Sequence, residues 1–177
     1  MILLAATTFL FSCTKSATEK SSDADTNYVK GYVIVGIDSN VTLEQLFANV
    51  NVLNLSIDEI SGYVYTTTIP QDSIAYIKSI LNSRSYINTR DFSANVYPHY
   101  LTNVVYNATI LWNMSLQNQT DYIKTKNALR MSFVPSSYMD MVLKVPDGQE
   151  KYWVSTFKTF NWVSWAELNM KDQIRVF

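Results

Sequence analysis

The sequence is poor in the residues from which many functional sites are built. Its 177 residues include one cysteine, one histidine and four glycines. A single cysteine cannot form a disulfide within the chain, and a lone histidine gives no metal-ligand spacing. Four scattered glycines exclude a phosphate-binding loop and a dinucleotide fingerprint. The 14 Lys and Arg balance the 15 Asp and Glu without a basic run, so we expect no cofactor, no metal and no nucleic-acid partner.

Catalytic groupings are also missing. His99 lies between the two halves of the chain, and no Gly-x-Ser-x-Gly elbow is present to supply a nucleophilic serine. Asp58 and Glu59 have the chemistry for acid–base catalysis. Because adjacent side chains in a strand point to opposite faces, we expect these two carboxylates to solvate a hairpin instead. The sequence predicts a protein that is not an enzyme and has no catalytic residues.

The cysteine, Cys13, stands where an apolar segment meets a polar one. The residues before it are mostly apolar, whereas residues 14–27 contain no aromatic or large aliphatic side chain. The apolar segment is shorter than the roughly 20 residues that cross a bilayer as a helix. Leu10-Phe11-Ser12-Cys13 resembles a bacterial lipobox, where a signal peptide is cut before a cysteine that receives a lipid. The alternative is a buried thiol that packs as a small hydrophobe.

The resemblance implies a signal peptide over residues 1–12, cut between Ser12 and Cys13, and a lipid on Cys13 that attaches the protein to a membrane. Residues 13–28 then form a flexible lipidated tether, because a polar segment buries too little apolar surface to offset the entropy of ordering it. The expected location is the bacterial cell envelope, with the outer membrane or cell surface favoured over the inner membrane.

The rest of the chain contains a degenerate internal repeat. Residues 31–92 align with residues 107–168 at an offset of 76, with few identities but with a matching apolar pattern. The matched pairs include Ile34 with Ile110, Leu46 with Tyr122, Leu53 with Leu129, Pro70 with Pro146 and Leu81 with Phe157. The alternative to duplication is a chance alignment of two strand-rich segments.

Each copy shows the pattern strand, helix, strand, strand, helix, strand. In the first copy, the β-branched residues 32–37 predict a buried strand, and the spacing of apolar side chains over residues 43–50 predicts an amphipathic helix. Gly62 separates two further strand patterns, residues 55–60 and 63–69, and so predicts a hairpin turn.

The order of elements resembles that of the ferredoxin-like sandwich, in which two helices lie on one face of an antiparallel sheet. We expect an α+β fold of two tandem ferredoxin-like βαββαβ units, over residues 29–100 and 101–177. The other face of each sheet needs cover, and the sequence leaves open whether the two sheets pack face to face or join edge to edge.

Part of the first copy also resembles the propeptide inhibitor module of subtilisin-type proteases. The matching places are Gly62-Tyr63-Val64-Tyr65, Pro70, the helix from Asp72 and Ser85-Tyr86-Ile87. The segment departs from that family in having no acidic cleavage tail. The resemblance implies the same βαββαβ fold and, as an alternative function, inhibition of a subtilisin-type protease.

The tryptophan-rich C-terminal third predicts a binding surface formed by Trp162, Trp165 and Glu167. If Ala166 faces the helices, Trp165 and Glu167 lie on the opposite face of the sheet. An exposed tryptophan there would stack on a sugar or anchor a protein partner; the alternative is that Trp165 fills the contact between the two sheets. We expect a binding or scaffolding module with a protein or glycan partner at the envelope. The second alternative is a glycan-binding or glycan-processing surface protein, in which surface carboxylates would carry out the processing.

Overall fold

The computed structural model describes residues 27–87, 94–99 and 105–171. Cys13, the predicted signal peptide and most of the predicted tether lie outside these residues. No helix in the described ranges is long and apolar enough to cross a membrane. The elements, in chain order, are β1 (Tyr28–Ile37), α1 (Leu43–Val52), β2 (Ser56–Ser61), β3 (Val64–Thr67), the short 3-10 turn η1 (Gln71–Ser73), α2 (Ile74–Asn82), β4 (Asn95–Pro98), β5 (Val105–Ala108), β6 (Leu111–Trp112), α3 (Leu116–Ala128), β7 (Met131–Val134), β8 (Asp140–Lys144), α4 (Glu150–Phe157) and β9 (Val163–Met170).

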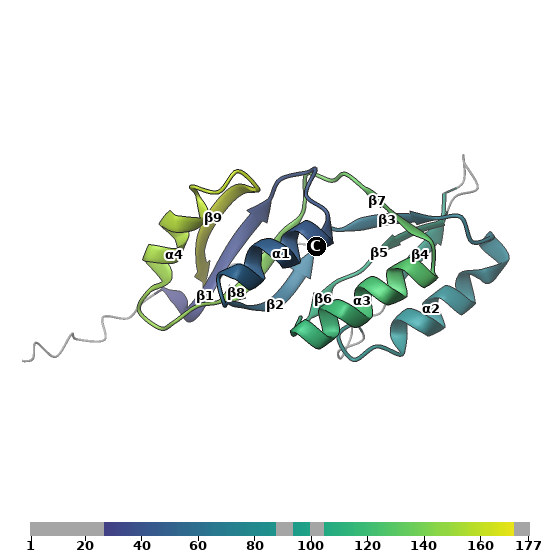
Figure 1. Cartoon of the computed structure of the whole chain (residues 1–177), viewed down its shortest axis with the longest axis horizontal. Coiled ribbons are helices and arrows are strands. Elements are labelled where there is room, and N and C mark those ends of the chain that lie inside the picture. The colour runs from purple at the N-terminus through teal and green to yellow at the C-terminus, as the bar shows by residue number, and fades with distance from the viewer. Residues whose placement is uncertain (1–26, 88–93, 100–104, 172–177) are drawn as a thin grey trace, which may run out of the picture.

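The strands form two antiparallel sheets (Figure 1). Sheet A has five strands in the order β6-β2-β8-β1-β9, and sheet B has four in the order β4-β5-β3-β7. Helices α1 and α4 pack on sheet A, while α2 and α3 pack on sheet B. The predicted α+β class is confirmed.

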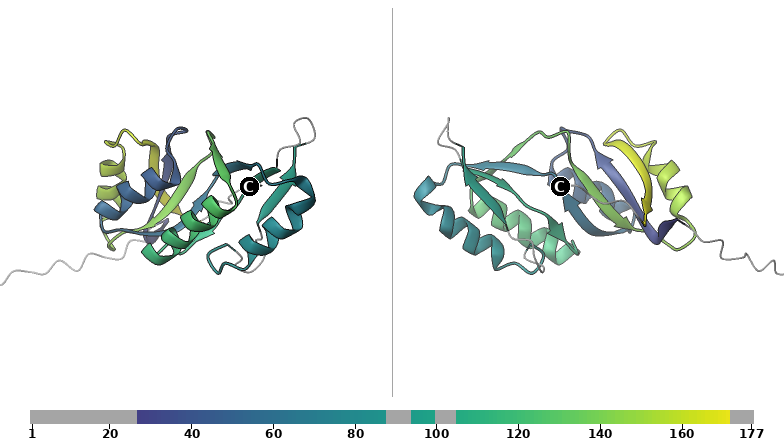
Figure 2. Two further views of the ribbon diagram at one scale, coloured as in Figure 1. Left: turned by 45° about the vertical axis from the view of Figure 1, so that its right-hand side comes forward. Right: turned by 180° about the vertical axis from the view of Figure 1, so that it is seen from behind.

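Each sheet takes strands from both halves of the chain. In sheet A, β1 and β2 of the first half lie with β8 and β9 of the second; in sheet B, β3 and β4 of the first half lie with β5 and β7 of the second. The chain therefore crosses between the sheets after β2, after β5, after β6 and after β7, which can be followed in the two views of Figure 2. Residues 29–100 and 101–177, expected as consecutive units, do not each form a sheet of their own.

The hairpin predicted around Gly62 is not formed, because β2 and β3 belong to different sheets. Gly62 has the positive φ of a turn, +77°, but it lies in the crossing from sheet A to sheet B. A Cβ atom on Gly62 would be 2.0 Å from the carbonyl oxygen of Tyr138. Tyr138 belongs to the connection between β7 and β8, in which the chain passes from sheet B back to sheet A. Glycine is the residue that permits both this φ and this close approach.

The two sheets are also connected where the strand pair β3–β5 of sheet B leads into the strand pair β2–β6 of sheet A. The chain continues from β5 in sheet B to β6 in sheet A, just as it continues from β2 to β3 in the reverse direction. Val64 faces Ala108 in sheet B, and Ile60 faces Leu111 in sheet A, with both pairs antiparallel. The two strand pairs thus run side by side across both sheets.

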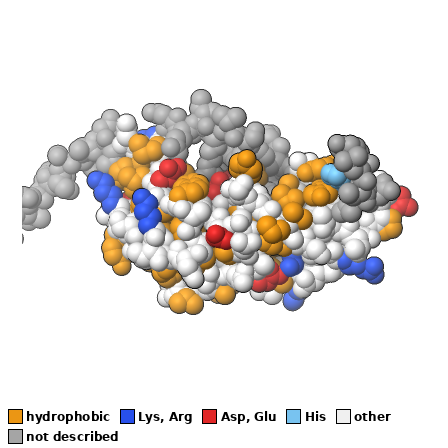
Figure 3. All heavy atoms as spheres, turned by 90° about the horizontal axis from the view of Figure 1, so that it is seen from above, with side chains coloured by type: hydrophobic (Ala, Val, Ile, Leu, Met, Phe, Trp, Pro, Cys, Tyr) orange, Lys and Arg blue, Asp and Glu red, His pale blue; other side chains and the backbone are white. Residues whose placement is uncertain are grey.

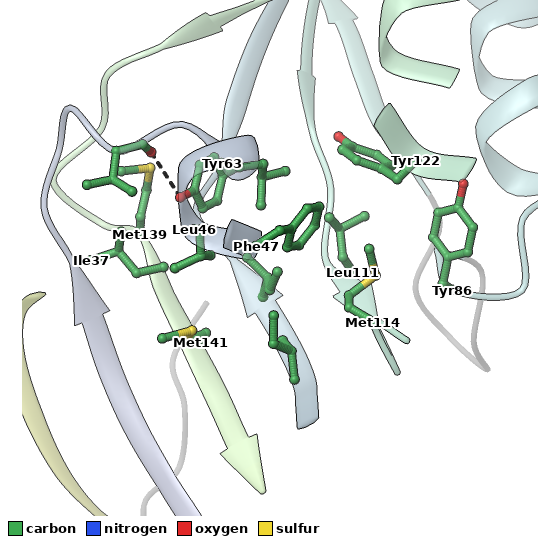
Figure 4. Close-up of a cluster of buried hydrophobic side chains, with 14 of the residues drawn as sticks. Ile37, Leu46, Phe47, Tyr63, Tyr86, Leu111, Met114, Tyr122, Met139 and Met141 are labelled. Carbon is green, nitrogen blue, oxygen red and sulfur yellow. Dashed lines mark hydrogen bonds between the residues drawn. The ribbon is translucent and has the colours of Figure 1, made fainter. Parts of the chain in front are cut away.

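A hydrophobic core fills the space between the helices and the sheets. The apolar positions predicted for α1 are all buried: Leu43, Leu46, Phe47 and Val50. Phe47 lies beside Leu111 and Met114 of the second half (Figure 4). The hydroxyl of Tyr63, another buried residue, donates to the carbonyl oxygen of Val41 at 3.0 Å.

Helices α1 and α3 are tied together at both ends in an antiparallel arrangement. Glu44, near the start of α1, forms a salt bridge with Lys126, near the end of α3. Asn51 and Gln119 exchange side-chain hydrogen bonds of 2.9 and 3.2 Å at the opposite ends of the two helices. These contacts hold the two halves of the chain together.

Candidate functional site

Two neighbouring hollows lie in and beside sheet A. The large hollow, of about 510 Å³, lies where β2 begins, between the end of α1 and the start of α3. The small hollow, of about 280 Å³, is lined by residues at the start of β1 and by β2, β8 and β9. Tyr32 and Asp58 line both hollows, so the two adjoin. We take them together as the candidate site.

Both halves of the chain contribute to the large hollow. Tyr32, Asn51 and Asp58 belong to the first half, whereas Gln119 and Lys144 belong to the second. Lys144 lies directly opposite Tyr32 in the ladder between β1 and β8. That ladder joins a strand of the first half to a strand of the second, so the site depends on the pairing between the halves.

A β-bulge in β2 shapes the site. Ile57 and Glu59 pair with consecutive residues of β8, so Asp58 is the extra residue of the bulge. Ile57 and Ile60 are both buried in the core, Glu59 is buried as well at 8% exposure, and Asp58 is half-buried. Both acidic residues line the small hollow. The expectation that these carboxylates solvate a hairpin is wrong, because β2 and β3 belong to different sheets.

The carbonyl groups beside the bulge hold the turn between β6 and α3. The N–H of Asn113 donates to the carbonyl oxygen of Asp58 at 2.7 Å, and the N–H of Met114 donates to that of Ile57 at 2.9 Å. Asn113 has φ +48°, in the left-handed region that asparagine tolerates better than most residues. The hydroxyl of Ser115 then caps the start of α3. Main-chain hydrogen bonds therefore fix one wall of the large hollow.

Two carboxamides in the large hollow are held in fixed orientations. The Gln119 amide nitrogen donates to the side-chain oxygen of Asn51 at 3.2 Å and to the carbonyl oxygen of Met114 at 2.8 Å. The Asn51 amide nitrogen in turn donates to the side-chain oxygen of Gln119 at 2.9 Å. A carboxamide has two donor hydrogens and two acceptor sites. These bonds therefore leave Asn51 one donor hydrogen and one acceptor site for a ligand.

Trp165 lies on the face of sheet A that the alternation of its strand predicted. Its neighbour Ala166 is buried in the core, whereas Trp165 is 42% exposed. The indole lies across Gly36, where a Cβ atom would be 2.0 Å from the indole nitrogen. Glu167 is exposed as well. Neither Trp165 nor Glu167 lines either hollow, so their predicted role in binding stays a prediction.

Trp162 belongs to an aromatic cluster at the end of α4. Its ring stacks on that of Phe160, with centroids 5.4 Å apart, and meets the ring of Phe157 edge-on at 6.0 Å. Phe157 is fully buried. The structure therefore gives Trp162 a packing role and does not bring it into the hollows.

His99 follows β4, and its ring packs on that of Tyr106 with centroids 5.2 Å apart. In the part of the chain that the structure describes, no group of three or more His, Cys, Asp or Glu side chains is arranged to hold a metal ion. On the face seen in Figure 3, the charged side chains of the described residues are scattered and form no large patch of one sign.

The residues that line the hollows include several that the sequence did not single out, namely Tyr32, Asn51, Asn113, Gln119 and Lys144. They lie far apart in the sequence and match no motif. No protein-family model, no curated protein and no solved structure matches the chain.

Proposed function

We propose that the protein is a non-enzymatic binding module of the bacterial cell envelope that holds its ligand in the two hollows around Tyr32 and Asp58. In this proposal the signal peptide is cut behind Ser12, and a lipid on Cys13 attaches the mature protein to a membrane. The resemblance of residues 10–13 to a lipobox supports the anchor.

We also propose that the body consists of two ferredoxin-like units that have exchanged halves. In a ferredoxin-like sheet the first and third strands lie in the middle, with the fourth beside the first and the second beside the third. The run β9-β1-β8-β2 in sheet A and the run β4-β5-β3-β7 in sheet B both agree with this order when the first two strands come from one half and the last two from the other. The repeated order of elements supports the same interpretation.

The observation that carries the binding proposal is the joint construction of the large hollow by both halves. Its lining combines carboxamides, hydroxyls and aliphatic side chains, with one carboxylate, one ammonium group and one phenol. Most of these groups hold a ligand by hydrogen bonds and contact, and they do not transfer protons at neutral pH. The hydrogen bonds around Asn113 and Asn51 hold part of the lining in place before a ligand arrives.

Hydrogen–deuterium exchange tests the binding site. The purified protein is measured alone, with a polysaccharide fraction and with a protein fraction of a bacterial envelope. A ligand in the hollows slows exchange in residues 28–37, 56–61 and 111–119 with at least one fraction, while β4 in sheet B stays unchanged. No slowing with either fraction at saturating amounts overturns the proposed site.

Intact-protein mass spectrometry tests the anchor. Expression in a bacterial host is expected to give a membrane-bound chain that lacks residues 1–12 and carries acyl groups. The Cys13→Ala variant is expected to be neither acylated nor cut at this place. An unmodified wild-type chain in the soluble fraction overturns the proposed location.

A further inference from the structure

We propose that the ligand of the two hollows is a neutral oligosaccharide; this inference rests on the proposed function. Three features of the lining carry it: the balance of charge, the supply of paired hydrogen-bonding groups, and an aromatic side chain shared by both hollows.

The charge of the lining disfavours an anionic ligand. Asp58 and Glu59 both line the small hollow, and Asp58 also lines the large one. Lys144 is the basic residue of the large hollow, and no Lys or Arg is among the described residues that line the small one. A phosphate, sulfate or uronic acid group would meet two carboxylates against one ammonium group, and like charges repel at short range. A neutral ligand avoids this repulsion.

The polar groups of the lining match vicinal hydroxyls. Asn51, Asn113 and Gln119 line the large hollow, and Asn169 lines the small one. Gln119 uses both amide hydrogens within the protein, so the ligand-binding groups are the Asn carboxamides, which can donate and accept, and the Asp58 carboxylate, which can accept. Such groups bind a pair of neighbouring hydroxyls that also donate and accept. Because Asn51 is already oriented by Gln119, its free donor and acceptor sites are ordered before binding.

Tyr32 supplies an aromatic side chain at the junction of the two hollows. It is half-buried and lines both of them. A phenol combines an apolar ring with a polar hydroxyl, and a sugar ring likewise has an apolar C–H face and a polar edge. Val29 and Val142 add aliphatic contact in the small hollow. A ligand of several sugars can therefore contact Tyr32 while its hydroxyls reach the amides and carboxylates on both sides.

Titration calorimetry of the full chain with a panel of oligosaccharides tests this inference. The panel contains gluco-, manno- and xylo-oligosaccharides and fully N-acetylated chito-oligosaccharides as neutral probes, and oligogalacturonate as the anionic probe. We expect binding of at least one neutral probe and none of oligogalacturonate. The variants Tyr32→Ala and Asp58→Asn are each expected to weaken that binding about tenfold, as the loss of a contact or of a charged hydrogen bond does.

Matched controls separate the site from the rest of the surface. Tyr138→Ala removes an exposed tyrosine and Asp72→Asn removes an exposed carboxylate, and neither residue lines a hollow. Both controls are expected to bind like wild type. Circular dichroism confirms that Tyr32→Ala and Asp58→Asn are folded, and Tyr32→Phe, which keeps the ring, is expected to restore most of the affinity.

The results distinguish this inference from the function on which it rests. If no neutral probe binds at millimolar concentration while the protein fraction slows exchange in residues 28–37 and 56–61, the ligand is a protein and the glycan inference is overturned. If no probe and no fraction binds, both proposals are overturned. Binding of oligogalacturonate, or equal affinity of Asp58→Asn and wild type, also overturns the inference.

Discussion

Gly62 lies directly against Tyr138: a Cβ atom on the glycine would be 2.0 Å from the tyrosine carbonyl oxygen. Gly62 belongs to the connection by which the chain leaves sheet A after β2, and Tyr138 to the connection by which it returns before β8. These two of the chain's crossings therefore meet at one point, and that point requires a residue without a side chain.

Replacing Gly62 with alanine is expected to destabilise the protein strongly. The alanine must adopt a left-handed φ, which costs about 1–2 kcal/mol, and its Cβ must also displace the backbone of Tyr138. Gly148→Ala is the matched control, since Gly148 has φ +80° but a Cβ atom there meets nothing within 4 Å. Urea unfolding should therefore show a larger loss for Gly62→Ala than for Gly148→Ala. Equal losses would mean that the contact with Tyr138 has no energetic importance.

Replacing Glu150 with glutamine is expected to lower the stability at neutral pH. The Glu150 side chain is 1% exposed and accepts hydrogen bonds from the N–H groups of Gly31 and Gly148 at 2.7 and 3.2 Å. Burial alone raises the pKa of Glu150, but these hydrogen bonds outweigh it and hold the pKa below its usual value. Loss of charged hydrogen bonds of this kind costs about 1.5–3 kcal/mol.

The sign of the Glu150 pKa shift also predicts a pH dependence. A lowered pKa in the folded state gives stability that is fully present above the unfolded pKa of about 4.3 and is lost as the pH falls from there through the folded pKa. Wild type should therefore lose its advantage over Glu150→Gln in that acidic range. Urea unfolding at pH 7 and at pH 3 measures this, with the exposed Glu167→Gln as control. A constant difference between wild type and Glu150→Gln would contradict the assignment.

The phenylalanine variant of Tyr63 is expected to lose about 1–2 kcal/mol of unfolding free energy. The Tyr63 hydroxyl is the hydrogen-bond donor to the buried carbonyl oxygen of Val41, and a buried acceptor left without a partner is costly. Tyr76, which is 57% exposed, provides the control, and Tyr76→Phe should change the stability by less than about 0.5 kcal/mol. Thermal unfolding of both variants would show the difference, and equal midpoints would refute the role given to this hydrogen bond.

Substitution of Gly36 by alanine is expected to move the indole of Trp165. A Cβ atom on Gly36 would be 2.0 Å from the indole nitrogen, so the ring must turn away into solvent. The tryptophan emission should shift to longer wavelength, and the same comparison in a Trp165→Phe background should show no shift. An unchanged spectrum in the Trp165-containing protein would show that the indole does not rest on Gly36.

The local patterns of the sequence predicted the elements well, but they did not predict which strands pair. The apolar spacing in residues 43–50 identified α1, and the repeated order of elements identified the α+β class. Such patterns do not show whether the chain turns back into a hairpin at Gly62 or crosses to the other sheet, because both need a positive φ there. The close approach of Tyr138 decides it, and that residue is remote in sequence.

The residues of the site were harder to predict for a related reason. The alignment at an offset of 76 matches Val33 with Thr109 and Leu143 with Thr67, yet Val33 faces Leu143 whereas Thr67 faces Val105. The two sheets thus differ in register, and the repeat does not transfer contacts residue by residue. The bulge at Asp58 likewise depends on its pairing with β8 and leaves no mark in the sequence.

The exchange of halves is the central claim, because it brings Tyr32 and Lys144 together at the proposed site. These residues are directly opposite each other on β1 and β8. Opposed residues of antiparallel strands have Cα atoms roughly 4.5–5.5 Å apart, a separation that a disulfide can bridge. Tyr32→Cys and Lys144→Cys are therefore introduced together in a Cys13→Ser background, with a protease site placed within residues 100–104. The control pair is Tyr32→Cys with Ser132→Cys, because β7 lies in sheet B.

The measurement is denaturing electrophoresis after oxidation and cleavage, with and without reductant. The exchanged fold predicts that the two halves of the Tyr32→Cys/Lys144→Cys chain stay joined until reductant is added, and that those of the control pair separate. Separation of both variants without reductant would mean that β1 and β8 are not neighbours, and would contradict both the fold and the site built on it.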